Sequence, residues 1–67
     1  MNKHEQATNE VIKWLELSPQ MTCEQVKSTI RKAFTEKYGN AVSKSVLETH
    51  IDDFTESVCL KLNINQD

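Results

Sequence analysis

The fold is decided by residues 46–62, which read VLETHIDDFTESVCLKL. An apolar side chain recurs there every three or four residues, which is the spacing that lines one face of an α-helix. These apolar residues are Leu47, Ile51, Phe54, Val58 and Leu62. The opposite face is acidic and carries Glu48, Asp52, Asp53 and Glu56. A helix of this kind is stable only when its apolar face packs on other elements, so the rest of the chain must supply them.

The composition limits the chain to one small domain. It has 67 residues, a net charge of −2, one glycine and one proline. A chain of this length is near the lower size at which a single core is sufficient, and a second copy is a common additional support. The scarcity of turn-forming residues favours helix throughout. We therefore expect one all-α, three-helix domain over residues 1–67, either as a compact bundle or as a helical homodimer.

The first helix is expected over residues 3–17. Asn2 is suited to be its N-cap, and Glu5 occupies the capping-box position three residues later. Pro19 ends this helix, because proline disfavours helical geometry at the residue before it and donates no backbone hydrogen bond. The apolar side chains of this helix cover a wider arc than packing on two neighbours requires. Either the helix is central, or part of it faces a partner.

The second helix, over residues 23–38, has the clearest start in the chain. Thr22 is a favoured N-cap residue, and Gln25 completes a capping box with it. Gly39 follows the last turn and is a natural C′ residue. The connection from Gly39 to Val42 is short, so we expect the second and third helices to be close neighbours.

The third helix, the organising one, is expected over residues 44–62. Ser43 is the preferred N-cap, and Ser45 paired with Glu48 is a competing cap. Residues 63–67 have no apolar periodicity, and we expect them to fray as chain ends commonly do.

The two cysteines, Cys23 and Cys59, do not have the spacing of a zinc site, and no histidine lies at ligand spacing from either. The first ten residues lack the apolar segment of a signal peptide, and no run approaches the ~18 apolar residues of a membrane span. We therefore expect a soluble, cytoplasmic protein with two reduced cysteines and no metal or cofactor. A single Cys23–Cys59 disulfide is the alternative.

No catalytic motif is present. The chain lacks a glycine-rich loop and the GxSxG, HExxH and P-loop patterns. His50 lies at the edge of the apolar face of the third helix, where a boundary histidine with a half-covered ring is the simpler interpretation, and His4 is expected in solvent. We expect the protein not to be an enzyme. A cysteine-dependent redox protein is the weakest alternative, because neither thiol has an evident cationic neighbour that would activate it.

Two surface features favour binding to another protein. Three of the acidic residues repeat every four positions and therefore repel one another, so that face is either simply solvated or a docking surface for a basic partner. Several apolar residues also exceed what the core requires, and tryptophan among them is enriched in binding hot spots. We predict a non-catalytic interaction or regulatory module, of adaptor or inhibitor type. Its predicted contact residues are Ile12, Trp14, Leu17, Glu48, Asp52, Glu56 and Leu60.

The alternative function is a dimeric, helix-turn-helix-like DNA-binding regulator. Three helices joined by short turns have that outline, although most small helical domains share it. The cations that would contact phosphates are Lys27, Arg31 and Lys32 of the second helix. The acidic face of the third helix and the negative net charge oppose this interpretation.

Overall fold

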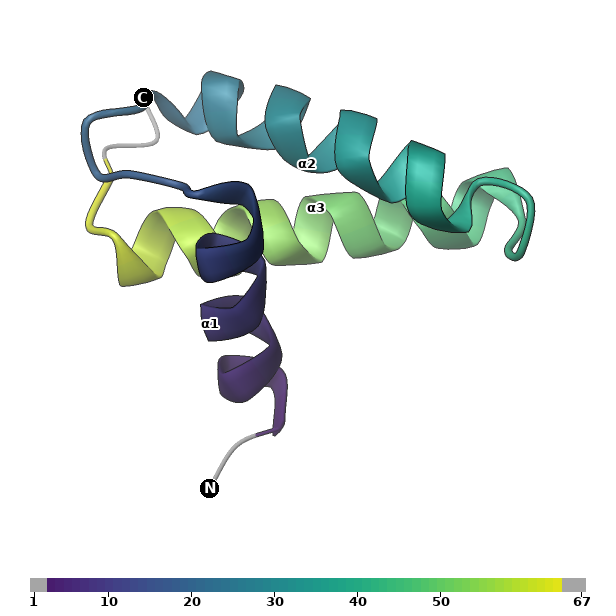
Figure 1. The fold of residues 1–67 in the computed structure, drawn as a ribbon, viewed down its shortest axis with the longest axis horizontal. Helices are drawn as coiled ribbons and strands as arrows, with labels where there is room; N and C mark the ends of the chain where they lie inside the picture. Colours follow the sequence, from purple (N-terminus) through teal and green to yellow (C-terminus); the bar gives the residue numbers. More distant parts are fainter. Residues whose placement is uncertain (1–2, 65–67) are drawn as a thin grey trace.

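The computed structural model describes residues 3–64, which form the helices α1 (Lys3–Leu15), α2 (Cys23–Tyr38) and α3 (Lys44–Lys61) and no β-strand. The helices α2 and α3 run antiparallel side by side, and α1 crosses them steeply near one end (Figure 1). The all-α, three-helix fold expected from the sequence is confirmed. Within the described range, no helix combines the length and apolarity that crossing a lipid bilayer requires.

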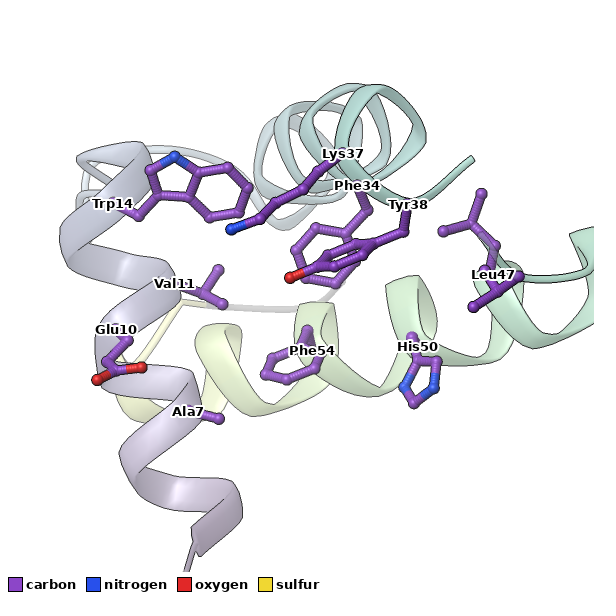
Figure 2. A pocket seen from close by; sticks show the side chains of 11 residues that line it. Ala7, Glu10, Val11, Trp14, Phe34, Lys37, Tyr38, Leu47, His50 and Phe54 are labelled. Atoms are coloured by element: carbon purple, nitrogen blue, oxygen red, sulfur yellow. The ribbon is translucent and has the colours of Figure 1, made fainter. Parts of the chain in front are cut away.

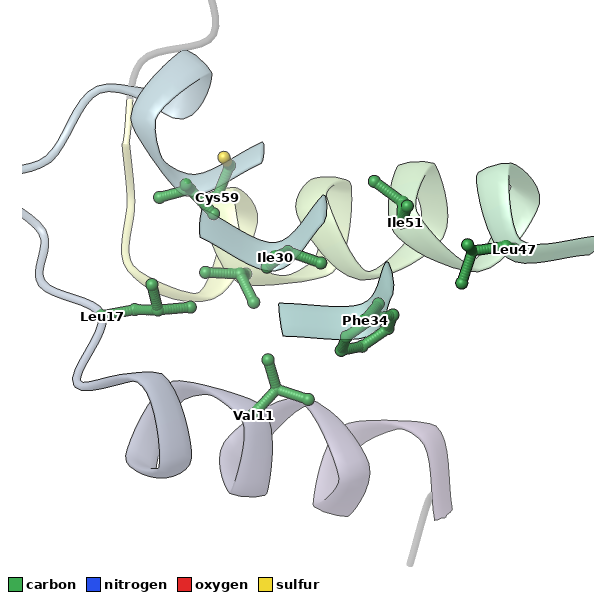
Figure 3. Close-up of a cluster of buried hydrophobic side chains, with 9 residues drawn as sticks. Val11, Leu17, Ile30, Phe34, Leu47, Ile51 and Cys59 are labelled. Carbon is green, nitrogen blue, oxygen red and sulfur yellow. The ribbon is translucent and has the colours of Figure 1, made fainter. Parts of the chain in front are cut away.

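The core lies where the three helices meet (Figure 3). Along α3, the apolar face expected from the sequence is the one that is covered: Leu47, Ile51 and Val58 are buried, and Phe54 packs against them half-buried. Helices α1 and α2 and the link between them add other large side chains. The buried apolar set is Val11, Leu17, Val26, Ile30, Phe34, Leu47, Ile51, Val58 and Cys59.

Two of the expected N-caps are present. The Thr22 hydroxyl accepts a hydrogen bond from the Gln25 N–H at 3.1 Å, and the Gln25 side chain accepts one from the Thr22 N–H at 2.9 Å. This reciprocal pair is the capping box. At the start of α3, the cap is Ser43 rather than Ser45, because its hydroxyl accepts from the Val46 N–H at 3.3 Å. Asn2 lies outside the described residues.

Helix α1 ends at Leu15, earlier than the expected Leu17. Glu16 adopts the left-handed conformation with φ of 53°, and the Leu17 N–H then donates to the Ile12 carbonyl at 3.0 Å. This is the Schellman motif, in which the chain reverses after a left-handed C′ residue. The reversal folds Leu17 back into the core, where it is buried.

The end of α3 is capped in the same way, where fraying was expected. Asn63 has φ of 58°, and the Ile64 N–H donates to the Cys59 carbonyl at 2.8 Å. Ile64 consequently packs against the core, half-buried. Residues 65–67 of the expected frayed tail lie outside the described part of the chain.

Gly39 caps α2 but lacks the left-handed geometry usual at a C′ glycine. Its φ is −57°, and its N–H donates to the Thr35 carbonyl at 2.9 Å. A side chain at this position would overlap that carbonyl. Glycine is therefore needed here for close backbone approach and not for a positive φ.

The expectation of two reduced cysteines is wrong, because Cys23 and Cys59 form a disulfide. The antiparallel pairing brings the first residue of α2 against the last turns of α3, with the two Cα atoms 5.9 Å apart. The bond closes a loop between residues separated by 36 positions. Loops of this length are expected to contribute about 4 kcal/mol to the free energy of unfolding, as much as the whole core of a very small domain.

Candidate functional site

A groove with a volume of about 520 Å³ lies in the angle between α1 and the α2–α3 pair (Figure 2). This volume is within the range of known ligand pockets. All three helices and the α2–α3 connection supply its walls. The lining residues are Ala7, Glu10, Val11, Trp14, Phe34, Lys37, Tyr38, Val42, Leu47, His50 and Phe54.

The groove exists because α1 is fixed over only one part of the pair. The link over residues 16–22 leads from the end of α1 to the start of α2, at the disulfide end of the molecule. Two contacts hold the N-terminal part of α1 on the second half of α3: His4 hydrogen-bonds to the Ser57 hydroxyl at 2.7 Å, and Lys61 pairs with Glu5 at 3.2 Å. The other end of the α2–α3 pair extends beyond α1 (Figure 1).

Aromatic rings form the base of the groove. The ring of Phe34 is buried and contacts three other rings, with centroid distances of 6.3 Å to Trp14, 5.7 Å to Tyr38 and 5.4 Å to Phe54. The last two contacts are edge-to-face, an arrangement that aromatic pairs favour. This packing fixes the position of the rings that form the base of the groove.

The rim of the groove is exposed and carries a cation over aromatic faces. Trp14 is 47% exposed and Tyr38 is 39% exposed. The Lys37 ammonium lies 4.8 Å from the Trp14 ring centroid and 5.6 Å from that of Tyr38, within the range of cation–π attraction. Lys37 belongs to no ion pair among residues 3–64. The groove therefore offers an apolar base with a positive charge at its edge.

The apolar residues predicted to contact a partner do not form one surface. Trp14 lines the groove. Leu17 belongs to the core, and Ile12 is half-buried against it, so neither is available in the way that the sequence suggested. Leu60 is 69% exposed but does not line the groove.

The acidic face of α3 is partly neutralised by α2. Asp52 pairs with Lys27 at 3.0 Å, and Glu48 pairs with Arg31. Glu56 is exposed and has no ion pair within the described range. Two of the three predicted acidic contact residues thus act between helices, and they engage two of the three cations assigned to the DNA-binding alternative. The third cation, Lys32, is exposed and belongs to no ion pair of residues 3–64.

The histidines differ from expectation. His4 was expected in solvent, but besides its hydrogen bond to Ser57 its ring lies 5.3 Å from that of Phe54. His50 lines the groove and is exposed. No group of three side chains that could bind a metal ion occurs over residues 3–64.

The sequence predicts Trp14 as a contact residue and His50 as a boundary histidine, but it does not predict the groove that both residues line. Glu10, Lys37 and Tyr38 were not singled out as candidate contact residues. One signal was available: Phe34 and Tyr38 are four residues apart, so they share a face of α2 next to a lysine that precedes the tyrosine. The position of α1 relative to that face could not be read from the pattern.

Comparison of the chain with models of known protein families, with curated proteins and with solved structures finds no match. The residues of the groove are thus the basis for any statement of function.

Proposed function

We propose that this protein is a small non-catalytic binding module, of adaptor or inhibitor type, which acts by holding apolar side chains of a protein partner in the groove between α1 and the α2–α3 pair. The observation that carries the proposal is the exposed Trp14 beside a fixed aromatic base. About half of the Trp14 side chain is exposed and takes no part in the core, so a partner can bury it.

The energetic argument rests on the area that a partner would cover. A tryptophan side chain of ~250 Å² that is about half exposed gains roughly 3 kcal/mol when the remainder is buried. Tyr38 and Val42 line the same rim and would be covered together with Trp14. Binding surfaces concentrate their free energy in a few aromatic residues of this kind.

The arrangement of ionisable groups supports a non-catalytic role. Glu10, Lys37 and His50 line the groove from three different helices, and no hydrogen bond joins any two of them in the described chain. Nucleophilic and acid–base catalysis need such groups within hydrogen-bond reach of one another. Here they stand apart around an apolar base, which suits recognition.

No observation favours the DNA-binding alternative. Lys27 and Arg31 face carboxylates on α3, so their charge is largely cancelled where phosphates would approach. We therefore carry forward the protein-binding function alone.

The cytoplasmic location stays a prediction, and the disulfide weighs against it. Cytosolic thiols are kept reduced by glutathione and thioredoxin, whereas disulfides persist in oxidising compartments. Alkylation of free thiols in intact cells would distinguish a reducing from an oxidising compartment. Cys23 and Cys59 should react with the reagent if they are reduced in the cytosol, and they should stay unmodified where the disulfide is intact.

Trp14 provides the test, because it is the only tryptophan in the chain and its emission reports on the groove. The probe is a synthetic amphipathic helix of roughly 14 residues with leucines along one face. We expect it to shift Trp14 emission to shorter wavelength in a saturable way. Val42→Arg, which places a charge in the groove, should weaken this binding.

A matched control variant distinguishes binding in the groove from nonspecific hydrophobic binding. Val46 is as exposed as Val42, at 43% against 37%, but does not line the groove. Val46→Arg should leave the titration unchanged. Absence of any emission change in the wild-type chain at a dilution where it is monomeric, or an equal loss in both variants, would contradict the proposed function.

A further inference from the structure

The exposed apolar surface of this protein is concentrated at the groove. Five large hydrophobic side chains are exposed over residues 3–64, and three of them line it: Trp14, Tyr38 and Val42. Apolar side chains scattered singly over a surface are ordinary, whereas a cluster in one depression marks an interaction site. The groove is therefore the candidate interaction surface of the described chain.

The charges on the two walls are opposite and unpaired. Glu10 extends from α1 and Lys37 from α2, with the Lys37 ammonium reaching over the Trp14 ring (Figure 2). Neither forms an ion pair among the described residues, although three other ion pairs join the helices. The groove therefore presents one anion and one cation beside its apolar base.

We infer that the groove is a contact surface between two copies of this chain, related by a two-fold axis that runs along it. An interface with two-fold symmetry must carry both members of every complementary pair on the same surface. The groove meets this requirement, because Glu10 of one protomer faces Lys37 of the partner subunit, and the same contact repeats across the axis. The inference rests on the proposed function, since the groove must first be a protein-binding surface.

The charge pattern favours a second copy over a strongly charged partner. A uniformly acidic helix would meet Glu10, and a uniformly basic one would meet Lys37, so each would have like charge on one wall. A second copy meets opposite charge on both walls, and like charges across an interface are costly. The net charge of −2 is small, so long-range repulsion between copies is weak.

The test is the molar mass by light scattering over a dilution series of the disulfide-bonded chain, with charge reversals at the two walls. Wild-type protein should dimerise. Glu10→Lys and Lys37→Glu should each weaken the dimer by about tenfold or more, because both symmetric contacts become repulsive. An equimolar mixture of the two variants should recover the dimer mass, since every wall contact in the mixed pair joins opposite charges.

Two charge reversals outside the groove serve as controls. Lys32→Glu and Glu36→Lys reverse exposed charges on α2 outside the groove and should leave the mass unchanged, alone or mixed. Circular dichroism verifies that each variant is helical. A monomeric wild-type chain at millimolar concentration overturns the inference, as does a mixture that stays monomeric.

These failures are distinguishable from failure of the proposed function. A monomer whose Trp14 emission still responds to the leucine peptide would leave the groove as a binding site for a different protein. A monomer that ignores the peptide would overturn both.

Discussion

Burial separates two residues of similar type on α3. The Ile51 side chain is fully buried, whereas Leu60 is 69% exposed. Ile51→Ala should lower the free energy of unfolding by about 3 kcal/mol, because it removes buried apolar surface and leaves a cavity. Leu60→Ala should change it by no more than ~0.5 kcal/mol. Urea unfolding followed by circular dichroism measures both, and equal losses would mean that α3 packs on a different face.

The start of α3 gives a second residue-level prediction. The sequence offers both Ser43 and Ser45 as caps, and the hydrogen bond to the Val46 N–H is made by Ser43. Ser43→Ala should therefore cost about 1 kcal/mol, the usual effect of removing an N-cap. Ser45→Ala, two residues further on, should have little effect on the urea midpoint. The reverse order would identify Ser45 as the cap.

Between elements, the disulfide is the strongest single constraint. It ties the start of α2 to the last turns of α3, beside the core residues of both helices. Opening it with a dithiol reductant, or replacing both cysteines by serine, should lower the free energy of unfolding by about 4 kcal/mol. Because a core of this size supplies only ~3–5 kcal/mol, the bond provides about half of the total stability, and the reduced chain should unfold at a much lower temperature.

The measurement is thermal unfolding by circular dichroism with and without reductant. An unchanged melting temperature after complete reduction, verified by thiol titration, would show that the bond contributes nothing to stability. The matched serine variant removes any direct effect of the reductant, since its melting curve should not respond to it.

The helices could be predicted from the sequence because their signals are local. The apolar period of α3 and the capping box at Thr22 depend on residues within a few positions of one another. The end of α1 was missed because glutamate rarely adopts the left-handed geometry that Glu16 has. Likewise, nothing near Cys23 or Cys59 in the sequence indicates that they meet, since only the antiparallel packing of α2 on α3 brings them together.

The candidate site was less predictable, because it depends on how α1 crosses the other helices. Trp14 was identified by its type, but its position over Phe34 follows from that crossing. The acidic face of α3 was interpreted as a docking surface, whereas α2 lies close enough for Lys27 to pair with Asp52. Contacts between helices of this kind are set by tertiary packing and leave no periodic trace in either helix.

The packing of the three helices determines where the groove lies in the molecule. The core and the Lys61–Glu5 ion pair hold α1 across one end of the α2–α3 pair (Figure 1), and the disulfide ties α2 to α3. The groove lies in the angle between α1 and that pair. The most exposed aromatic side chain, Trp14, stands on its rim. We propose that this groove lies in an interface between protein chains.

Amide NMR shifts of the oxidised, isotope-labelled chain, recorded residue by residue from millimolar to low micromolar concentration, test whether the groove lies in an interface between copies. If it does, we expect concentration-dependent shifts in the groove walls, at Glu10, Trp14 and Lys37, and steady shifts at Leu60 and Lys32. Shifts centred on Leu60, or none in the groove over the whole range, would contradict this proposal.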